Sequence, residues 1–332
     1  MTPPRPAFVR AALLAVLASG AAASLLVGRG DLGDPDLGAT FLRLRAWRLG
    51  CSALAGAALA CAGVLVQGLF RNPLASPSIL GTTAGASLGG VSVLLLWDAL
   101  LASRLPRAVP PELVLPLGCL AGAWLSLTVL LVIVRRNSGP LAVLLTGFIL
   151  SSLFLSVGGF LTSLAQERWE LGRAVVAFTL GGVEAKGPRH VALALPLVAA
   201  GAAAAFGWRR HLDVLLSGEE EAQALGVDVP LVRRWVIAWT ATLTAAAVAV
   251  GGNVTFVGLV VPHVLRPFVG VSHRALLPTA LVGGAAFVTW ADVLTRVLPT
   301  RGQVPLGVVT GLVGAPVFLV LLARANRAGR LA

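Results

Sequence analysis

The side chains that could carry out chemistry are few, and they stand apart from one another. The four histidines are scattered along the chain, at His190, His211, His263 and His273. No two histidines have the spacing of metal ligands, and the three cysteines form no CxxC pair. The sequence has neither a phosphate-binding GxxxxGKS or GxxxxGKT loop nor a GxSxG nucleophile motif. We therefore predict that this chain is not an enzyme, has no catalytic residue and no metal site, and binds no cofactor itself.

One acidic residue lies clearly inside an apolar run, together with a base. Asp292 precedes Arg296 by four residues, so a helix brings both side chains to one face. A proton relay and a plain ion pair near the end of a helix both account for this spacing. The ion pair is favoured, because a proton-driven pump or carrier usually has more buried acids.

A second group of charges is entirely acidic. Ser217 precedes Glu219–Glu221, and Gly226 follows shortly afterwards. Ser217 can cap a short helix, three glutamates suit its positive end, and Gly226 can end it. We expect a short helix within residues 217–227. A solvated surface helix and a contact for a soluble partner explain this segment equally well.

The composition tells which kind of protein must position these residues. Of the 332 residues, 57% are hydrophobic and 12% are charged, and the mean hydropathy is +0.89. A soluble domain has about 25% charged residues. These values exclude a soluble enzyme, a disordered tail and a fibrous protein. They favour an all-α polytopic membrane protein that forms one domain over residues 1–332.

The net charge of +12 does not point to nucleic acid. The arginines stand singly or in pairs between apolar runs, as residues that set membrane topology do. We therefore predict that the chain binds no nucleic acid. We expect membrane lipid to surround its helices.

Ten apolar runs are long enough to be candidate membrane spans. They cover approximately residues 8–28, 46–70, 79–97, 113–134, 141–164, 190–208, 231–251, 256–270, 276–298 and 304–323. Glycines recur every four residues at Gly81, Gly85 and Gly89, and again at Gly118 and Gly122, which indicates closely packed helices.

An even number of spans places both chain ends on one side of the membrane. Paired arginines such as Arg135-Arg136 and Arg209-Arg210 adjoin helix ends on that same side, which predicts that both termini are cytoplasmic. The first run resembles a signal peptide at Ala21-Ala22-Ala23, but it continues apolar beyond the short core that a signal peptide needs. We therefore predict a retained first helix.

Two connections contain more than a turn. On the inner side, Pro73 and Pro77 forbid a continuous helix across residues 71–78. A plain cytoplasmic turn and an interrupted segment lining a cavity both explain them. On the outer side, residues 166–189 surround a short apolar stretch with charges and predict an interfacial helix ended by Gly181-Gly182. This outer helix could cover a pore mouth or meet a partner.

Several motifs in matching order resemble one family, the permease subunits of type II ABC importers for iron chelates, haem and vitamin B12 (FecCD-like). The motifs are Leu69-Phe70-Arg71-Asn72-Pro73-Leu74-Ala75, Gly258-Leu259-Val260-Val261-Pro262-His263, His273-Arg274, Ala291-Asp292, Pro305-Leu306-Gly307 and Gly314-Ala315-Pro316. The resemblance covers about residues 42–325. It implies about ten transmembrane helices per subunit and a homodimer with a central translocation path.

The resemblance also implies partners. Two ATP-binding cassette subunits bind the inner face and carry ATP and Mg²⁺, and an extracytoplasmic substrate-binding protein delivers cargo at the outer face. Residues 217–227 resemble the coupling helix that contacts the ATPase. The site residues implied there are Gly218, Glu219, Glu220, Glu221, Ala222, Leu225 and Gly226.

Two further sites follow from the resemblance. Asn72, Pro73 and Leu74 match the cytoplasmic gate, whereas Ser138-Gly139-Pro140 matches the gate position of the fifth helix less well. Arg45, Arg48 and Arg296 match outer arginines that pair with acids on the binding protein.

The expected function is import of an iron chelate, siderophore or haem, across the bacterial cytoplasmic (inner) membrane by alternating access, with the ATPase on another subunit. Vitamin B12 is the alternative cargo within the family. A secondary transporter driven by an ion gradient is the alternative of another class, and it predicts no partner at Glu219–Glu221.

Overall fold

A computed structural model describes residues 6–28, 30–96, 111–134, 139–184, 186–298 and 304–327. In these ranges all regular structure is helical and there is no strand, which confirms the predicted all-α class. Seven helices are long and apolar enough to cross a membrane: α1 (Pro6–Leu26), α2 (Gly38–Leu69), α4 (Pro111–Ile133), α5 (Pro140–Ala165), α7 (Pro188–Leu215), α9 (Val229–Gly251) and α11 (His273–Val297).

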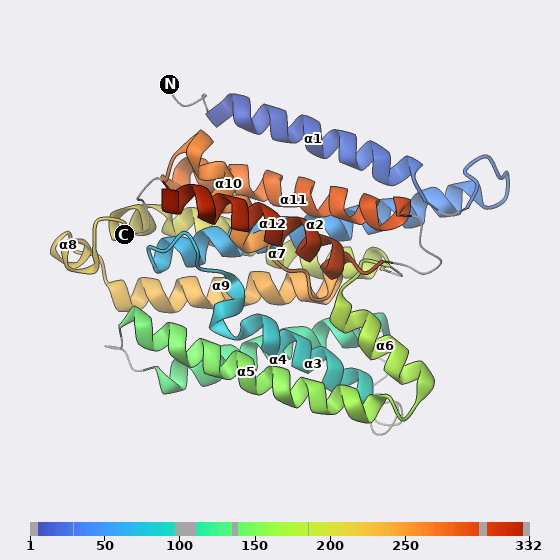
Figure 1. The fold of residues 1–332 in the computed structure, drawn as a ribbon, viewed down its shortest axis with the longest axis horizontal. Coiled ribbons are helices and arrows are strands. Elements are labelled where there is room, and N and C mark those ends of the chain that lie inside the picture. Colours follow the sequence, from blue (N-terminus) through green and yellow to red (C-terminus); the bar gives the residue numbers. More distant parts are fainter. Residues whose placement is uncertain are drawn as a thin grey trace.

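Three shorter apolar helices complete the set: α3 (Thr82–Leu96), α10 (Val257–Val269) and α12 (Leu306–Arg327). Each of the ten overlaps one predicted span. Between them lie the short helices α6 (Trp169–Leu180) and α8 (Glu219–Ala224) and the 3₁₀ turn η1 (Pro77–Leu80). In Figure 1, α1 begins and α12 ends at the same end of the bundle as α8.

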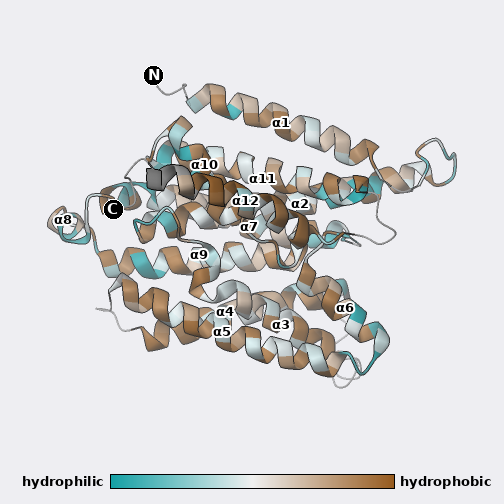
Figure 2. Ribbon diagram, in the orientation of Figure 1, coloured by the Kyte–Doolittle hydropathy of each residue, from teal (hydrophilic) through white to brown (hydrophobic). Residues whose placement is uncertain are grey.

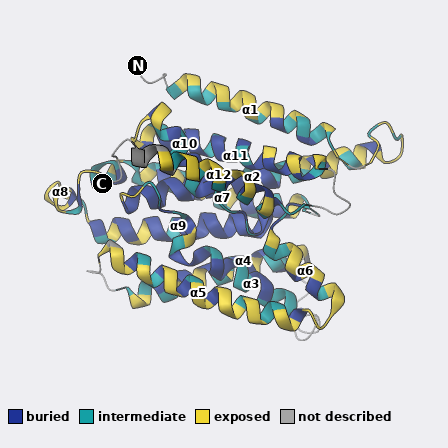
Figure 3. Cartoon of the chain, in the orientation of Figure 1, coloured by how far each residue is buried: buried dark blue, intermediate teal, exposed yellow. Residues whose placement is uncertain are grey.

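The helices form layers around three largely buried members, α2, α9 and α11. α2 packs against α9, α7 and α11, and α9 also packs against α4 and α3, which pack against each other. Figure 1 shows α1 alone on one edge, against α11, and α5 on the opposite edge. α2 and α9 are largely buried, whereas α1 and α5 expose most of their length (Figure 3). Hydrophobic residues dominate the helices along their length (Figure 2).

Glycines let several of these helices approach to backbone contact. The predicted glycine stripes meet each other: Gly85 lies against Gly122, and Gly89 against Gly118. A second set joins α2 to its neighbours. A Cβ atom added to Gly63 would lie 1.9 Å from the carbonyl oxygen of Gly258 in α10. The backbones of α2 and α10 therefore touch where α10 begins.

Candidate functional site

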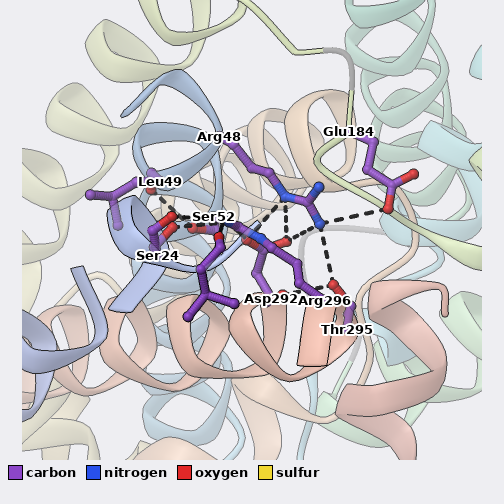
Figure 4. A network of polar contacts seen from close by, with 9 residues as sticks. Ser24, Arg48, Leu49, Ser52, Glu184, Asp292, Thr295 and Arg296 are labelled. Carbon is purple, nitrogen blue, oxygen red and sulfur yellow. Dashed lines mark hydrogen bonds and ion pairs between the residues drawn. The ribbon is translucent and has the colours of Figure 1, made fainter. Parts of the chain in front are cut away.

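Arg45 and Arg48, which are three residues apart on α2, and Arg296 of α11 come together near the α6 end of the bundle. Arg48 of α2 and Arg296 of α11 both point to Asp292, which is completely buried (Figure 4). The Nη2 atom of Arg48 is 2.7 Å from Asp292 Oδ1, and its Nε atom donates to the same oxygen at 2.9 Å. Arg48 also donates to Thr295 Oγ1 at 3.2 Å. The ion pair predicted between Asp292 and Arg296 is present, with Arg48 as its third member.

Arg45 and Arg296 also hold the end of α1. The last carbonyl groups of a helix have no partner within the helix. Arg45 donates through Nη1 to the carbonyl oxygens of Leu25 and Leu26, each at 2.9 Å. Arg296 donates through Nη1 to those of Ser24 at 2.7 Å and Val27 at 3.0 Å. Two guanidinium groups from α2 and α11 thus neutralise the negative end of α1.

The loop between α6 and α7 adds opposite charges to this cluster. The Glu184 carboxylate lies 3.6 Å from Arg48 Nη2. Three guanidiniums and two carboxylates leave one positive charge in excess. Lys186 lies in the same loop, and burial lowers the pKa of its ammonium group below the ordinary value. The side chain of Arg48 remains 19% exposed, whereas Arg45 is only 6% exposed. Docking of a binding protein on these arginines stays a prediction.

The segment predicted as the inner gate leaves the end of α2 in a tight turn. Asn72 is exposed, and its side-chain oxygen accepts a hydrogen bond from the backbone N–H of Leu74 at 2.9 Å. Pro73 lies between them, and Arg71 before them has a positive φ of 50°. Gly139 directly precedes α5, while Ser138 lies outside the described residues. The role of this segment as a gate stays a prediction.

A second interrupted segment, which the sequence did not single out, lines a cavity together with part of the first. Residues 252–256 separate α9 from α10, and Phe256 has a φ of 66°, which is rare for a residue with a side chain. Together with residues 76–78 and 83, this segment lines a cavity of about 230 Å³. Irregular backbone at membrane depth occurs where it lines a cavity or is buried in protein. Gly252-Asn253 was the available sequence signal, since both residues favour turns.

The predicted coupling segment projects beyond the ends of the spanning helices (Figure 1). Its helix α8 has only six residues, and Gly218, with a φ of 141°, is its N-cap. Ser217 was wrongly expected to cap the helix: its hydroxyl instead donates to the carbonyl oxygen of Val214 at 2.7 Å. Gly226 follows the last turn with a φ of 85°. A left-handed backbone is what glycine supplies at this place.

The side chains of this segment divide into inward and outward groups. Glu219 accepts a hydrogen bond from Arg233 of α9 at 2.8 Å, and Ala222 is fully buried. The exposed members include Glu220, Glu221 and Leu225, of which Leu225 is 71% exposed. The inward group fixes the short helix on the bundle. The outward group presents two carboxylates and an apolar side chain.

A further contact at this end was missed in the sequence. Asp213 of α7 accepts hydrogen bonds from the backbone N–H of His273 at 2.8 Å and from Ser272 Oγ at 3.2 Å, so it caps α11 from another helix. Its carboxylate also lies 2.6 Å from His273 Nδ1. No local sequence pattern predicts a cap that is supplied from 60 residues away.

Within the described residues, no three His, Cys, Asp or Glu side chains gather where they could hold a metal ion. The buried charges form ion pairs and helix caps. The arrangement offers binding surfaces at both ends and cavities between helices.

Comparisons with known proteins agree with this architecture. Residues 11–324 match the FecCD transport family. The chain is 38% identical to the Fe(3+) dicitrate transport system permease protein FecD of Escherichia coli over 83% of each chain. It is 37% identical to the cobalamin import system permease protein BtuC of Halobacterium salinarum, over 84% of this chain and 72% of that one. It is 35% identical to the hemin transport system permease protein HmuU of Yersinia pestis, over 86% and 83%.

A solved structure has the same fold. It is an inward-facing conformation of a metal-chelate type ABC transporter, with a TM-score of 0.84 and 27% identity over 96% of this chain and 99% of that one. The resemblance seen in the sequence motifs is confirmed: the chain belongs to the FecCD transport family of ABC-transporter permeases.

Proposed function

We propose that this chain is the membrane permease subunit of an ATP-driven importer, and that its cargo is an iron chelate, either a ferric siderophore or haem. The observation that carries the proposal is the family match over residues 11–324, together with relatives named for iron dicitrate and hemin. A separate ATPase subunit binds ATP and Mg²⁺, and a binding protein delivers the cargo. Cobalamin is the alternative cargo, supported by a relative of nearly equal identity.

The proposed transport unit is a homodimer whose path runs along the dimer axis, in the bacterial cytoplasmic membrane with both termini cytoplasmic. The apolar side chains exposed along α5 support such a contact, among them Leu145, Phe148 and Ile149. The mass of the purified complex tests this part of the proposal. A mass that corresponds to one permease copy in the transporting complex contradicts it.

We infer that the ATPase docks on α8. Glu220 and Glu221 are exposed there, whereas Glu219 is engaged with Arg233. Changing Glu220→Lys together with Glu221→Lys leaves that inner ion pair intact. We expect the double variant to reduce ATPase co-purification at least about tenfold. The two lysines would face the basic groups of the ATPase that we expect to pair with Glu220 and Glu221, and like charges brought together in an interface are strongly unfavourable. Retained co-purification and uptake would contradict the coupling role.

The matched control makes the same charge change at the other end of the molecule. Glu167→Lys with Glu170→Lys reverses two exposed carboxylates near the start of α6. Its ATPase co-purification is expected to equal that of the unchanged protein.

We infer that the binding protein docks near Arg45, Arg48 and Arg296, where one positive charge remains in excess. Reversing Arg45 or Arg296 is a poor test, because a carboxylate there would face the carbonyl oxygens at the end of α1. Ionic strength is a better variable. Raising it from about 0.05 M to 0.5 M should slow association about tenfold and change dissociation much less. An association rate that is insensitive to salt contradicts this docking site.

A further inference from the structure

A cavity of about 330 Å³ opens near the α8 end of the bundle, next to the coupling segment. It lies between the end of α4, the beginning of α5 and the beginning of α9. Its lining residues are Leu130, Leu131, Val134, Val143, Pro230, Arg233, Arg234 and Ile237. Six of these eight are apolar, and the two arginines are neighbours in the sequence.

The apolar walls follow the membrane-spanning helices inward. Pro230 and Ile237 are seven residues apart on α9, which corresponds to a rise of about 10 Å. Ile237 lies three residues, about 4.5 Å, beyond Arg234 along α9, so the apolar lining extends from the level of Arg234 into the hydrocarbon core. A polar occupant at this depth would lose its hydrogen bonds to water and gain none from aliphatic walls. A hydrocarbon chain suits these walls.

The two arginines differ in what they contact. Arg233 is 8% exposed, and its Nη2 atom lies 2.8 Å from Glu219 Oε1 of α8. Arg234 is exposed, and within the described part of the chain its guanidinium makes no hydrogen bond or ion pair. Trp235, the next residue, is 48% exposed. Tryptophan prefers the boundary between lipid and water, so its position places Arg234 at the level of lipid headgroups.

We propose that this cavity binds an anionic phospholipid. One acyl chain lies between α4, α5 and α9, and the phosphate group pairs with the Arg234 guanidinium, which presents planar donors suited to phosphate. Basic cavities between spanning helices are known to hold anionic headgroups. The proposal rests on the cavity and its charges, and it does not depend on the cargo or on the ATPase. Because Arg233 also holds Glu219, the lipid would lie directly beside α8.

An acidic segment of a partner protein would satisfy the same two arginines but not the aliphatic walls below them. The depth of the apolar lining therefore favours a lipid. A free anion would use Arg234 and leave the cavity unfilled.

The test measures thermal stability of the purified full-length permease in a neutral detergent. Added dioleoylphosphatidylglycerol, at about 100 times its dissociation constant, should raise Tm by about 5 °C. Dioleoylphosphatidylcholine should raise it much less, because its headgroup has no net charge. An equal rise with both lipids would overturn the proposal, and so would a rise obtained with inorganic phosphate alone.

Three variants locate the effect. Arg234→Gln should weaken phosphatidylglycerol binding at least about tenfold. The control Arg210→Gln, which removes another exposed arginine near the same end, should leave binding unchanged. Val143→Phe keeps both arginines and fills the cavity, so it should also weaken binding. If Arg234→Gln and Val143→Phe both bind the lipid as the unchanged protein does, the cavity is not the site.

Discussion

Gly63→Ala is expected to abolish recovery of folded permease. The added Cβ atom would lie 1.9 Å from the carbonyl oxygen of Gly258 and 2.6 Å from its carbonyl carbon. Real Cβ atoms do not approach backbone atoms so closely. The added methyl group would therefore force the backbones of α2 and α10 apart. Gln67 of α2 donates to the Leu259 carbonyl oxygen at 3.2 Å in the same junction. Separating the helices would therefore also leave a buried amide without its partner.

The measurement is the fraction of detergent-extracted protein that elutes as a single sharp peak in size-exclusion chromatography. Gly207→Ala is the matched control, because it makes the same change inside α7, where no heavy atom lies within 4 Å of the added Cβ. We expect the control to match the unchanged protein. Normal recovery of Gly63→Ala would show that α2 and α10 are not packed as described.

Asp292→Ala is expected to lower the free energy of unfolding by about 3–5 kcal/mol, because it leaves buried guanidinium groups without their carboxylate. Asp292 is 0% exposed, and both Arg48 and Arg296 point to it. The loss should loosen α11 from α2 and, through Arg296, release the end of α1. Thermal unfolding of the purified protein measures the change.

Glu112→Ala provides the comparison for an exposed ion pair. Glu112 pairs with Arg189 at 2.8 Å, but both side chains are about half exposed, at 52% and 56%. Exposed pairs contribute little, because water and salt screen them. We expect almost no change in Tm for this variant. If the two variants unfold at the same temperature, the buried cluster does not stabilise the bundle.

The spans could be predicted from sequence because each depends on local composition. The ten apolar runs correspond to the ten long or apolar helices of the described residues. Their ends were less accurate. α2 begins at Gly38 instead of residue 46, and α7 continues past Arg209-Arg210 to Leu215. At these places charged residues end the apolar run in the sequence, but the helix continues through them.

The candidate site could be predicted only where it depends on short spacing. The Asp292–Arg296 pair spans four residues and was found, whereas Arg48 joins Asp292 from 244 residues away. The same limit applies to Asp213 and His273. A cap that one helix supplies to another depends on how the two helices pack, and no local sequence pattern contains that information. The inward direction of Arg45, with its hydrogen bonds to the end of α1, was missed for this reason.

We propose that this permease imports an iron chelate at the expense of ATP. The most direct measurement is uptake of radiolabelled ferric siderophore, haem and cobalamin in a strain that lacks this chain, with and without the restored gene, before and after ATP depletion. We predict that iron-chelate or haem uptake is lost in the deletion strain, returns with the gene and stops when ATP is depleted. Loss of cobalamin uptake alone would keep the mechanism and contradict the cargo. Uptake that persists without ATP but collapses with the ion gradient would contradict the ATP-driven account altogether.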